Sequence, residues 1–487
     1  MKPIRLQALP SRRSGAFAPC HPFQTFPGSP TQNIQRTFWA GFIVLTLLWV
    51  AAEPHFYEAT TVFAWRATMR QYTGLIAMGS MSVAMLLALR PRWPERWLGG
   101  LDKMYRLHKW LGINALIFSI LHWLWVNAPK WAVGWGLLER PARKSTEGGQ
   151  GQAGLDMTLE AWLRTQRHLA EGMGEWAFYA AVALIALALI RFFPYHWFYK
   201  SHRLLAIVYL VLVFHSVVLM EFAYWSEPVG WLTAALLAAG TAAAVIVLLR
   251  RVGAGQKIMA KIAALRYYEG VDALEITADI PDWPGHKPGQ FAFATSDRSE
   301  GAHPYTIASA WNPERPQLTA VIKGLGDHTR RLRERLHVGQ ALKVEGPYGC
   351  FTFDGGGARQ IWVGAGIGIT PFISRLDYMR QQAEGEHPSL PPGQRIDLFH
   401  STADVDHDAL ARLAADASAA DVRLHVFIDA QHGRLTGQRI RDEVPDWREA
   451  SIWFCGPVGF ADALRRDFAA HGFPVRRRFH HELFQMR

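Results

Sequence analysis

Long apolar runs occupy the first half of the chain and do not recur in the second half. Six of them approach or reach the roughly 20 residues that an α-helix needs to cross a bilayer. These runs lie near residues 37–52, 71–89, 105–126, 174–193, 203–220 and 229–249. From residue 251 onward, charged and Gly/Pro-rich stretches alternate with short β-like runs, which is typical of a soluble α/β portion. The pattern therefore predicts six transmembrane helices followed by a soluble module.

Basic residues collect in every second loop, and cytoplasmic loops are the ones that collect Lys and Arg. They follow the second, fourth and sixth runs: Arg90, Arg92, Arg96, Lys103, Arg106 and Lys109, then Arg191, Lys200 and Arg203, then Arg250, Arg251 and Lys257. The opposite loops contain Glu53 and Glu58, or Glu221 and Glu227. Both termini are therefore expected in the cytoplasm, and the compact loops favour a bacterial inner membrane. This pattern explains most of the net charge of +11, which gives little support for nucleic-acid binding.

Two polar segments flank the predicted helices. Residues 1–36 are expected to form a flexible cytoplasmic tail, because the first apolar run starts too far along the chain for a cleaved signal. The loop at 127–173 is basic and has a Gly-rich tip at 146–154; its cations are Arg140, Arg143, Lys144, Arg164 and Arg167. It could attract an anionic acceptor such as a ferric chelate, or its charge could be incidental, because long loops escape the charge rule.

Four histidines in the third and fifth runs are the main candidates for chemistry. His108 and His122 lie fourteen residues apart, and His202 and His215 lie thirteen apart. At a rise of about 1.5 Å per residue, the two members of each pair are separated by roughly 20 Å along their helix. Two such helices side by side offer two stacked bis-imidazole sites, each suited to one haem iron. With the orientation that the loop charges give, His108 and His202 belong to the inner haem, and His122 and His215 to the outer haem. The alternative is four unrelated histidines bonded to carbonyl groups.

The two spacings are not equivalent on an ideal helix. A step of fourteen residues returns to within about 40° of the same face, whereas a step of thirteen lands roughly 140° away. The sequence therefore predicts an irregular turn or a bulge between His202 and His215.

A glycine-rich turn marks a nucleotide site in the soluble half. The sequence Gly364-Ala365-Gly366-Ile367-Gly368-Ile369-Thr370-Pro371 follows the apolar run 361–363 and precedes a helix-like segment. Glycines let a backbone approach a pyrophosphate closely, and a helix amino terminus offers it unpaired N–H groups. Thr370 is expected to cap that helix, with Pro371 at its first position. The glycine spacing differs from G-x-G-x-x-G.

Four further motifs appear in order before this turn. They are Pro288-Gly289-Gln290-Phe291, His303-Pro304-Tyr305-Thr306-Ile307-Ala308-Ser309, Gly326-Asp327-His328-Thr329 and Glu345-Gly346-Pro347-Tyr348-Gly349. Together they are similar to the flavin barrel of the ferredoxin-NADP reductase superfamily. With Leu101-Asp102 to Leu107-His108-Lys109-Trp110, the chain resembles the NADPH oxidase and ferric reductase family from about residue 37 to its end.

The resemblance implies a three-part architecture. Residues 37–250 would form a membrane all-α six-helix bundle that binds two b-type haems. Residues 251–357 would form an FAD-binding β-barrel, and residues 358–487 an NAD(P)H-binding α/β domain.

The resemblance also implies roles for individual residues. His303, Pro304, Tyr305, Thr306 and Ser309 would contact FAD, with Lys323, Gly326 and Thr329 at its pyrophosphate. The NAD(P)H site would comprise Gly364, Gly366, Gly368 and Thr370, with Cys455, Gly456 and Pro457 near the nicotinamide. Phe484 would cover the flavin face, or be an ordinary core residue. Arg70 matches a family arginine that could pair with a haem propionate or assist the outer acceptor, or it could simply snorkel.

Two departures from the family pattern concern substrates. Ser401-Thr402-Ala403-Asp404 stands where NADPH-preferring relatives place an arginine, and only Arg375 or Arg434 are nearby substitutes. Val126 stands where superoxide-producing relatives carry a further histidine.

The combined expectation is a transmembrane oxidoreductase that passes electrons from cytoplasmic NAD(P)H through FAD and two haems to an outer acceptor, a ferric chelate first. Reduction of oxygen to superoxide, or of a periplasmic protein or quinone, remains an alternative. A haem-binding membrane sensor without enzymatic activity is the alternative of another class.

Overall fold

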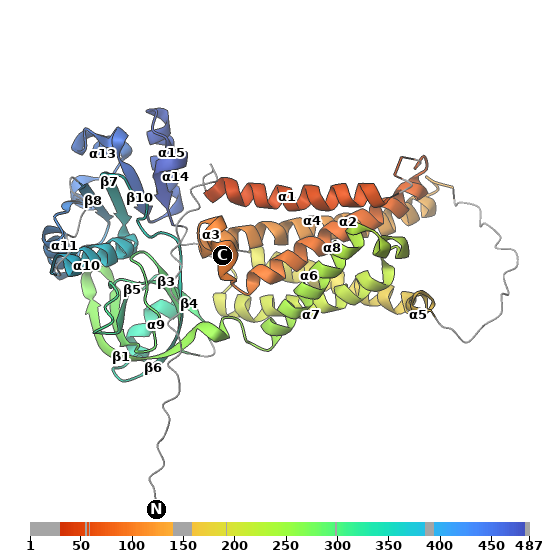
Figure 1. Cartoon of the computed structure of the whole chain (residues 1–487), viewed down its shortest axis with the longest axis horizontal. Helices are drawn as coiled ribbons and strands as arrows, with labels where there is room; N and C mark the ends of the chain where they lie inside the picture. The colour runs from red at the N-terminus through yellow and green to blue at the C-terminus, as the bar shows by residue number, and fades with distance from the viewer. Residues whose placement is uncertain are drawn as a thin grey trace, which may run out of the picture.

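The computed structural model describes residues 30–53, 56–57, 59–139, 158–190, 192–297, 300–384 and 394–482. It consists of an elongated helical bundle with a two-sheet module at one end (Figure 1). Residues 1–29 of the predicted amino-terminal tail, the Gly-rich loop tip and Phe484 lie outside the described residues. The prediction of a flexible tail is wrong for residues 30–36, which form the start of the first helix.

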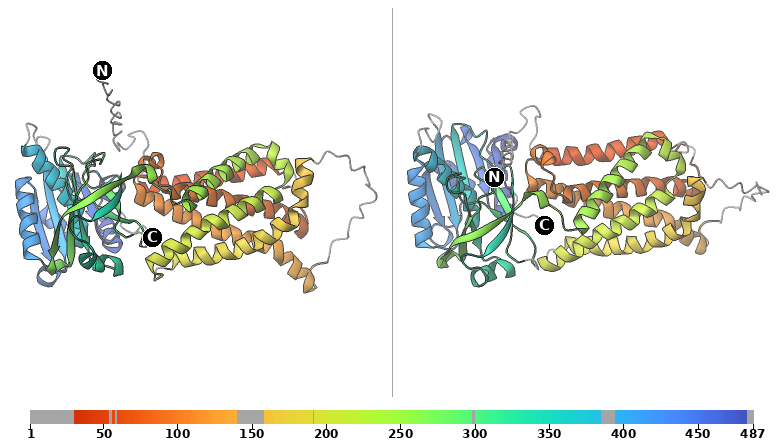
Figure 2. Two further views of the ribbon diagram at one scale, coloured as in Figure 1. Left: turned by 90° about the horizontal axis from the view of Figure 1, so that it is seen from below. Right: turned by 60° about the horizontal axis from the view of Figure 1, so that its bottom comes forward.

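Eight helices form the bundle in the described part of the chain. They are α1 (Pro30–Ala52), α2 (Val62–Ala88), α3 (Arg92–Leu98), α4 (Leu101–Gly134), α5 (Leu159–Thr165), α6 (Arg167–Leu189), α7 (Tyr195–Leu219) and α8 (Pro228–Leu248). All but α3 and α5 are long and apolar enough to cross a membrane, which confirms the six predicted helices. Figure 2 shows them running along the long axis, away from the module.

The first sheet of the module is antiparallel. Its strands are β1 (Lys257–Tyr268), β2 (Ala273–Asp279), β3 (Phe291–Thr295), β4 (His303–Thr306), β5 (Gln317–Lys323) and β6 (Ala341–Tyr348), with helix α9 (Asp327–Arg335) after β5. The strand order is β4-β3-β6-β1-β2-β5, and the two edge strands are joined only at the isolated bridge Ile307–Ala320. The predicted closed barrel is thus an open sheet, because β4 has four residues and Pro304 has no N–H to donate to a ladder.

The second sheet is parallel, with the order β11-β10-β7-β8-β9. Its strands are β7 (Arg359–Ala365), β8 (Arg395–Thr402), β9 (Arg423–Ile428), β10 (Ser451–Cys455) and β11 (Phe479–His481). The helices around them are α10 (Thr370–Glu384), α11 (His407–Ala419), α12 (Asp429–His432), α13 (Gly437–Glu443), α14 (Val458–Ala470) and α15 (Val475–Arg478). Alternate residues of β7 serve opposite cores, with Ile361 and Val363 on one face and Trp362 on the other. Burial of both faces is typical of a parallel sheet.

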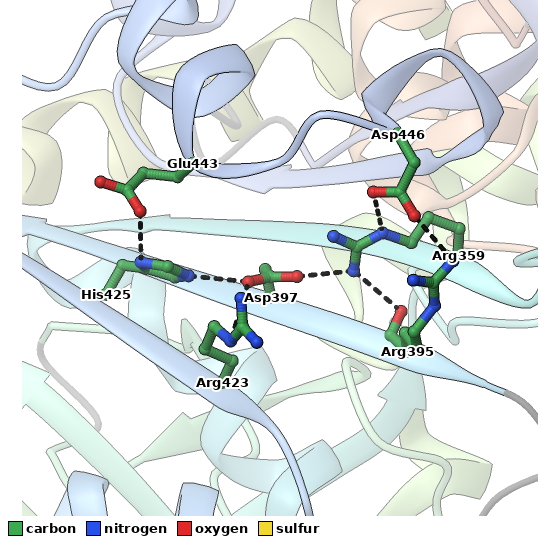
Figure 3. A network of polar contacts seen from close by, with 7 residues as sticks. All are labelled: Arg359, Arg395, Asp397, Arg423, His425, Glu443 and Asp446. Carbon is green, nitrogen blue, oxygen red and sulfur yellow. Dashed lines mark hydrogen bonds and ion pairs between the residues drawn. The ribbon is translucent and has the colours of Figure 1, made fainter.

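A network of charged side chains ties together the amino ends of three parallel strands (Figure 3). The buried Asp397 on β8 binds Arg359 Nη1 of β7 at 2.5 Å and His425 Nε2 of β9 at 2.7 Å. Arg359 also donates from Nε to Asp446 at 2.8 Å. This network lies at the end of the sheet opposite the glycine turn, so it positions the strands rather than a ligand.

The bundle and the first sheet share one hydrophobic core. Leu98, Leu101 and Met104 of the bundle pack with Phe291 and Tyr348 of the sheet. Polar contacts surround this core: Arg90 Nη1 donates to Glu345 at 2.8 Å, and the amide of Gly349 donates to Glu95 Oε1 at 2.6 Å. The start of α4, the helix that carries His108 and His122, is therefore fixed directly to the soluble module.

Candidate functional site

The four predicted histidines form two facing pairs between α4 and α7. The ring centres of His108 and His202 are 5.9 Å apart, and those of His122 and His215 are 6.2 Å apart. The first pair lies toward the module, since α4 begins there, and the second lies deeper along the bundle. The structure thus brings His108 together with His202 and His122 together with His215, as predicted.

The separation of the rings fits a metal ion held between two imidazoles. An imidazole nitrogen binds a first-row metal at about 2 Å and lies about 1 Å from its ring centre, so two opposed ligands have ring centres about 6 Å apart. Both observed separations agree with this value. The two sites could therefore each hold the iron of one haem.

Backbone carbonyls orient three of the four rings. His108 Nδ1 lies 2.9 Å from the carbonyl of Ala84, and His122 Nδ1 lies 2.9 Å from the carbonyl of Arg70. His215 Nδ1 lies 2.8 Å from the carbonyl of Ala170. A carbonyl oxygen only accepts, so each Nδ1 carries the proton and donates it, which leaves the Nε2 lone pair for a metal.

Helix α2 supplies two of these carbonyls at a matching spacing. Arg70 and Ala84 are fourteen residues apart on α2, like His122 and His108 on α4, and the order is reversed because the two helices are antiparallel. One helix therefore orients both imidazoles of its neighbour. The sequence contains this match, but only the antiparallel packing reveals it.

Two glycines let helices come close to the deeper pair of rings. A Cβ on Gly74 of α2 would lie 3.3 Å from His122 Nδ1, and a Cβ on Gly174 of α6 would overlap the ring of His215. Gly174 is thus required for the contact between α6 and His215.

The predicted irregularity between His202 and His215 is wrong, because α7 is a continuous α-helix from Tyr195 to Leu219. The prediction assumed that α7 is parallel to α4 and that the α-carbons of His202 and His215 lie on the same face of α7. Inclination of one helix to the other, together with rotation of each imidazole about its side-chain bonds, removes that requirement without breaking the helix.

Arg70 lies in a charged cluster at the far end of the bundle. Arg66 and Arg167 repel its guanidinium, whereas Glu171 and Glu221 attract it. Its own carbonyl holds His122, so Arg70 lies directly beside the second histidine pair. Arg167 also pairs with Glu171 at 3.0 Å, so the three arginines and two glutamates leave one net positive charge beside that pair.

The predicted flavin residues lie on β4 and just after it. Thr306 is buried, and its Oγ1 has no hydrogen-bond partner among the described residues, as expected of a group that binds a ligand. Ser309 instead accepts the amide of Thr319 at 3.0 Å and faces the neighbouring cleft. At the start of α9, the Thr329 hydroxyl accepts the amide of Gly326 at 3.0 Å and donates to the Gly326 carbonyl at 3.1 Å.

His303 stacks on His328 of α9, with ring centres 4.0 Å apart and planes 9° from parallel. Burial lowers the pKa of His303 to about 4, and the nearby His328 adds to the shift, so the ring is neutral near pH 7. Glu300 lies close enough for the three side chains to share a metal ion. Parallel rings, however, direct their lone pairs along parallel lines rather than toward one ion, so flat stacking groups fit this position better.

The glycine turn and the Cys455 segment meet at the carboxyl edge of the parallel sheet. The turn forms a short 3-10 helix, Gly366–Ile369, between β7 and α10. A Cβ on Gly368 would overlap the carbonyl oxygen of Cys455, so this glycine permits the contact. Gly366 has a φ of +54° and open space beside it, which suits the close approach of a ligand. Gly456 and Pro457 follow Cys455 at the same edge.

The predicted capping role of Thr370 is wrong. Thr370 is the first residue of α10, is buried, and donates its hydroxyl to the carbonyl of Ile367 at 2.7 Å. The preceding 3-10 turn shifts the helix start, so the hydroxyl closes the turn rather than accepting an N–H. The cleft beside the turn is lined instead by Gly366, Ile367 and Ile369.

Glu482 is a candidate that the sequence reasoning missed. It is 6% exposed, and burial raises its pKa to about 8, with a further rise from Asp102 that Lys103 partly opposes. The same buried group affects Cys455, whose thiol pKa is raised mainly by burial. Its place two residues before Phe484 was the only signal in the sequence.

Two family models match separate parts of the chain. Residues 73–213 match the ferric reductase like transmembrane component, and residues 257–352 match an FAD-binding domain. The first range contains His108, His122 and His202 and ends two residues before His215, and the second contains β1 to β6.

Curated relatives match the chain over limited regions. The flavohemoprotein of Bordetella pertussis is 32% identical over 163 residues, or 31% of this chain and 39% of that protein. Ferric reduction oxidase 4 of Arabidopsis thaliana is 35% identical over 133 residues, or 26% of this chain and 19% of that protein. The chain thus spans about two fifths or less of the length of these relatives. Among solved structures, the flavohem-like FAD/NAD binding domain of nitric oxide dioxygenase from Vibrio cholerae aligns with 46% of this chain and 97% of its own, at 18% identity and a TM-score of 0.39.

Proposed function

Because the chain has the domain architecture of the ferric reductase and NADPH oxidase family, we propose that it is a membrane NAD(P)H-dependent oxidoreductase. It takes electrons from NAD(P)H on the cytoplasmic side and delivers them through FAD and two b-type haems to an acceptor outside, a ferric chelate. The observation that carries the proposal is the two histidine sites, whose ring separations suit a metal ion and in which carbonyls hold three of the four Nδ1 atoms.

The proposed parts follow the chain. Residues 37–250 bind the haems, 251–357 bind FAD and 358–487 bind NAD(P)H. FAD accepts a hydride and releases single electrons, and haem iron carries those electrons one at a time. His108 and His202 hold the iron nearer the module, and His122 and His215 hold the iron farther from it.

The residues of the module hold and orient the two nucleotides. His303, Pro304, Tyr305, Thr306 and Ser309 position the flavin, and Gly326 and Thr329 serve its pyrophosphate. Lys323, which the resemblance also assigned to that pyrophosphate, instead pairs with Asp404 at the edge of the parallel sheet. The glycine turn, including Thr370, and Cys455 to Pro457 form the NAD(P)H site.

A reduced-minus-oxidised spectrum with haem and FAD quantitation tests this assignment in the purified full chain. We expect two b-type haems and one FAD.

His122→Ala should remove one haem and stop reduction of an acceptor outside sealed vesicles, while NAD(P)H still reduces the flavin. His168→Ala changes an exposed histidine on α6 and is the control. Two haems retained in His122→Ala would contradict the ligand assignment.

The acceptor is tested separately. Val126 stands where superoxide-producing relatives have a histidine, and the arginines around Arg70 favour an anion, so a negatively charged ferric chelate should be reduced faster than oxygen. Parallel rates of chelate reduction and superoxide formation measure this. If superoxide were the main product, the proposed acceptor would be oxygen and not a ferric chelate.

A further inference from the structure

The end of strand β8 lies where the adenosine part of a bound dinucleotide would extend. Strands β7 and β8 are parallel neighbours, with Ala365 opposite Ser401, so their carboxyl ends share one edge. The glycine turn follows β7, and Thr402, Ala403 and Asp404 follow at the end of β8. When a pyrophosphate lies at such a turn, the adenosine ribose reaches the end of the neighbouring strand.

A cavity of about 420 Å³ lies at this edge, between the two sheets. It is lined by the glycine turn, by the end of β8 and by β5 of the antiparallel sheet. Asp404 contributes to the lining and has a half-exposed side chain. Its carboxylate is therefore accessible to a nucleotide.

Carboxylates dominate the charge around Asp404. Asp406, two residues on, caps α11 through the amide of Ala409 at 3.0 Å and accepts the amide of Gly270 at 3.0 Å. These donors hold the pKa of Asp406 below its ordinary value, so it is ionised near pH 7. Lys323 pairs with Asp404 at 2.5 Å, which leaves a net negative charge on the three side chains.

The other cations of the cavity wall are mostly engaged. Arg412 pairs with Glu275 at 2.9 Å, and Arg380 pairs with Asp377 at 2.6 Å. Of the two arginines that the sequence offered for a 2′-phosphate, neither lines the cavity: Arg375 lies over Tyr378 on α10, and Arg434 precedes α13.

We propose that Asp404 makes the nucleotide site select NADH over NADPH, a proposal that rests on the proposed function. The 2′-hydroxyl of NADH can donate a hydrogen bond to the Asp404 carboxylate. The 2′-phosphate of NADPH has no proton to spare for that bond, and it would bring roughly two negative charges toward Asp404 and Asp406.

The test compares the two nucleotides as reductants of the flavin in the purified full chain. We expect kcat/KM to be at least about tenfold higher for NADH. Asp404→Asn removes one negative charge and frees Lys323, so it should lower this ratio at least about tenfold, chiefly by lowering the KM for NADPH. Asp408→Asn changes an exposed carboxylate in the next helix, α11, and should leave the ratio unchanged.

A binding measurement separates this proposal from the function itself. Adenosine 5′-monophosphate and its 2′-phosphorylated form carry no nicotinamide, and tryptophan fluorescence can follow their binding. The wild-type chain should bind the unphosphorylated form more tightly, and Asp404→Asn should narrow the difference. If neither dinucleotide reduced the flavin, the proposed function would fail while this comparison still tested Asp404. A wild-type preference for the 2′-phosphorylated form, or a ratio unaffected by Asp404→Asn, would overturn the proposal.

Discussion

Gly174 determines how closely helix α6 can approach the ring of His215. A Cβ at this position would overlap Nδ1 of His215, the atom that donates to the carbonyl of Ala170. We expect Gly174→Ala to displace the ring and to lower the haem content of the purified chain by about half, because one of two sites loses a ligand geometry that tolerates displacements of only about 0.5 Å.

Gly172 provides the matched control for this change. It lies on the same helix, and a Cβ there would meet no atom within 4 Å. Gly172→Ala should therefore keep the full haem content. Equal haem content in both variants would show that His215 does not depend on its contact with α6.

The sequence predicted which residues meet but not what holds them. Two spacings in apolar runs were enough to pair His108 with His202 and His122 with His215. The groups that support the rings are backbone carbonyls, which every residue has, and the space left by Gly174. Neither distinguishes these positions in the sequence. The site around Asp404 could be predicted only in part. The sequence showed that no arginine stands there, but it did not show the ion pair between Asp404 and Lys323.

Among the elements, strands β7, β8 and β9 depend on a buried carboxylate at their amino ends. Burial raises the pKa of Asp397, but hydrogen bonds from His425 and Arg359 outweigh it and keep the pKa below its ordinary value. Asp397→Asn would leave the Arg359 charge with less compensation. We expect a loss of about 3 kcal/mol in the free energy of unfolding, which thermal unfolding of the full chain can measure.

The sign of the pH dependence follows from the lowered pKa of Asp397. The unfolded chain takes up this proton at a higher pH than the folded chain, so the contribution of Asp397 is present above the unfolded pKa of about 4 and is lost as the pH falls through the folded value. Asp397→Asn should lose less stability than the wild type between about pH 5 and pH 3. Asp462→Asn, an exposed carboxylate on α14, should behave like the wild type.

The hydrophobic pattern predicted the types of the elements better than it predicted whether the first sheet closes into a barrel or how the turn before α10 is built. The six long helices were predicted because about 20 apolar residues leave few alternatives. The open first sheet was missed because closure depends on the short strand β4 and on Pro304. The 3-10 turn before α10 was missed because Thr370 and Pro371 together resemble an ordinary helix start.

For the whole molecule, the important feature is that α4, the helix that carries His108 and His122, begins against the soluble module. Lys103 binds Asp102 at 3.1 Å, and both are buried near Glu482, which follows the last strand of the parallel sheet. We call the buried group of Asp102, Lys103 and Glu482 the joint. Domain boundaries inferred from composition could not show it, because its residues come from opposite ends of the chain. The end of the parallel sheet therefore lies near the membrane bundle, close enough for Asp102 and Lys103 to shift the pKa of Glu482.

The joint should weaken as the pH rises, because a buried carboxyl must ionise there. The pKa of Glu482 is about 8 in the folded chain, whereas an unfolded glutamate has a pKa of about 4.5. Between these values the folded chain holds a proton that the unfolded chain has released, so its stability falls with rising pH. Glu482→Gln stays neutral and should flatten the fall in melting temperature between about pH 5 and pH 8. Glu334→Gln, an exposed change on α9, should keep the wild-type slope, and an unchanged slope in Glu482→Gln would mean that Glu482 ionises freely in the folded chain.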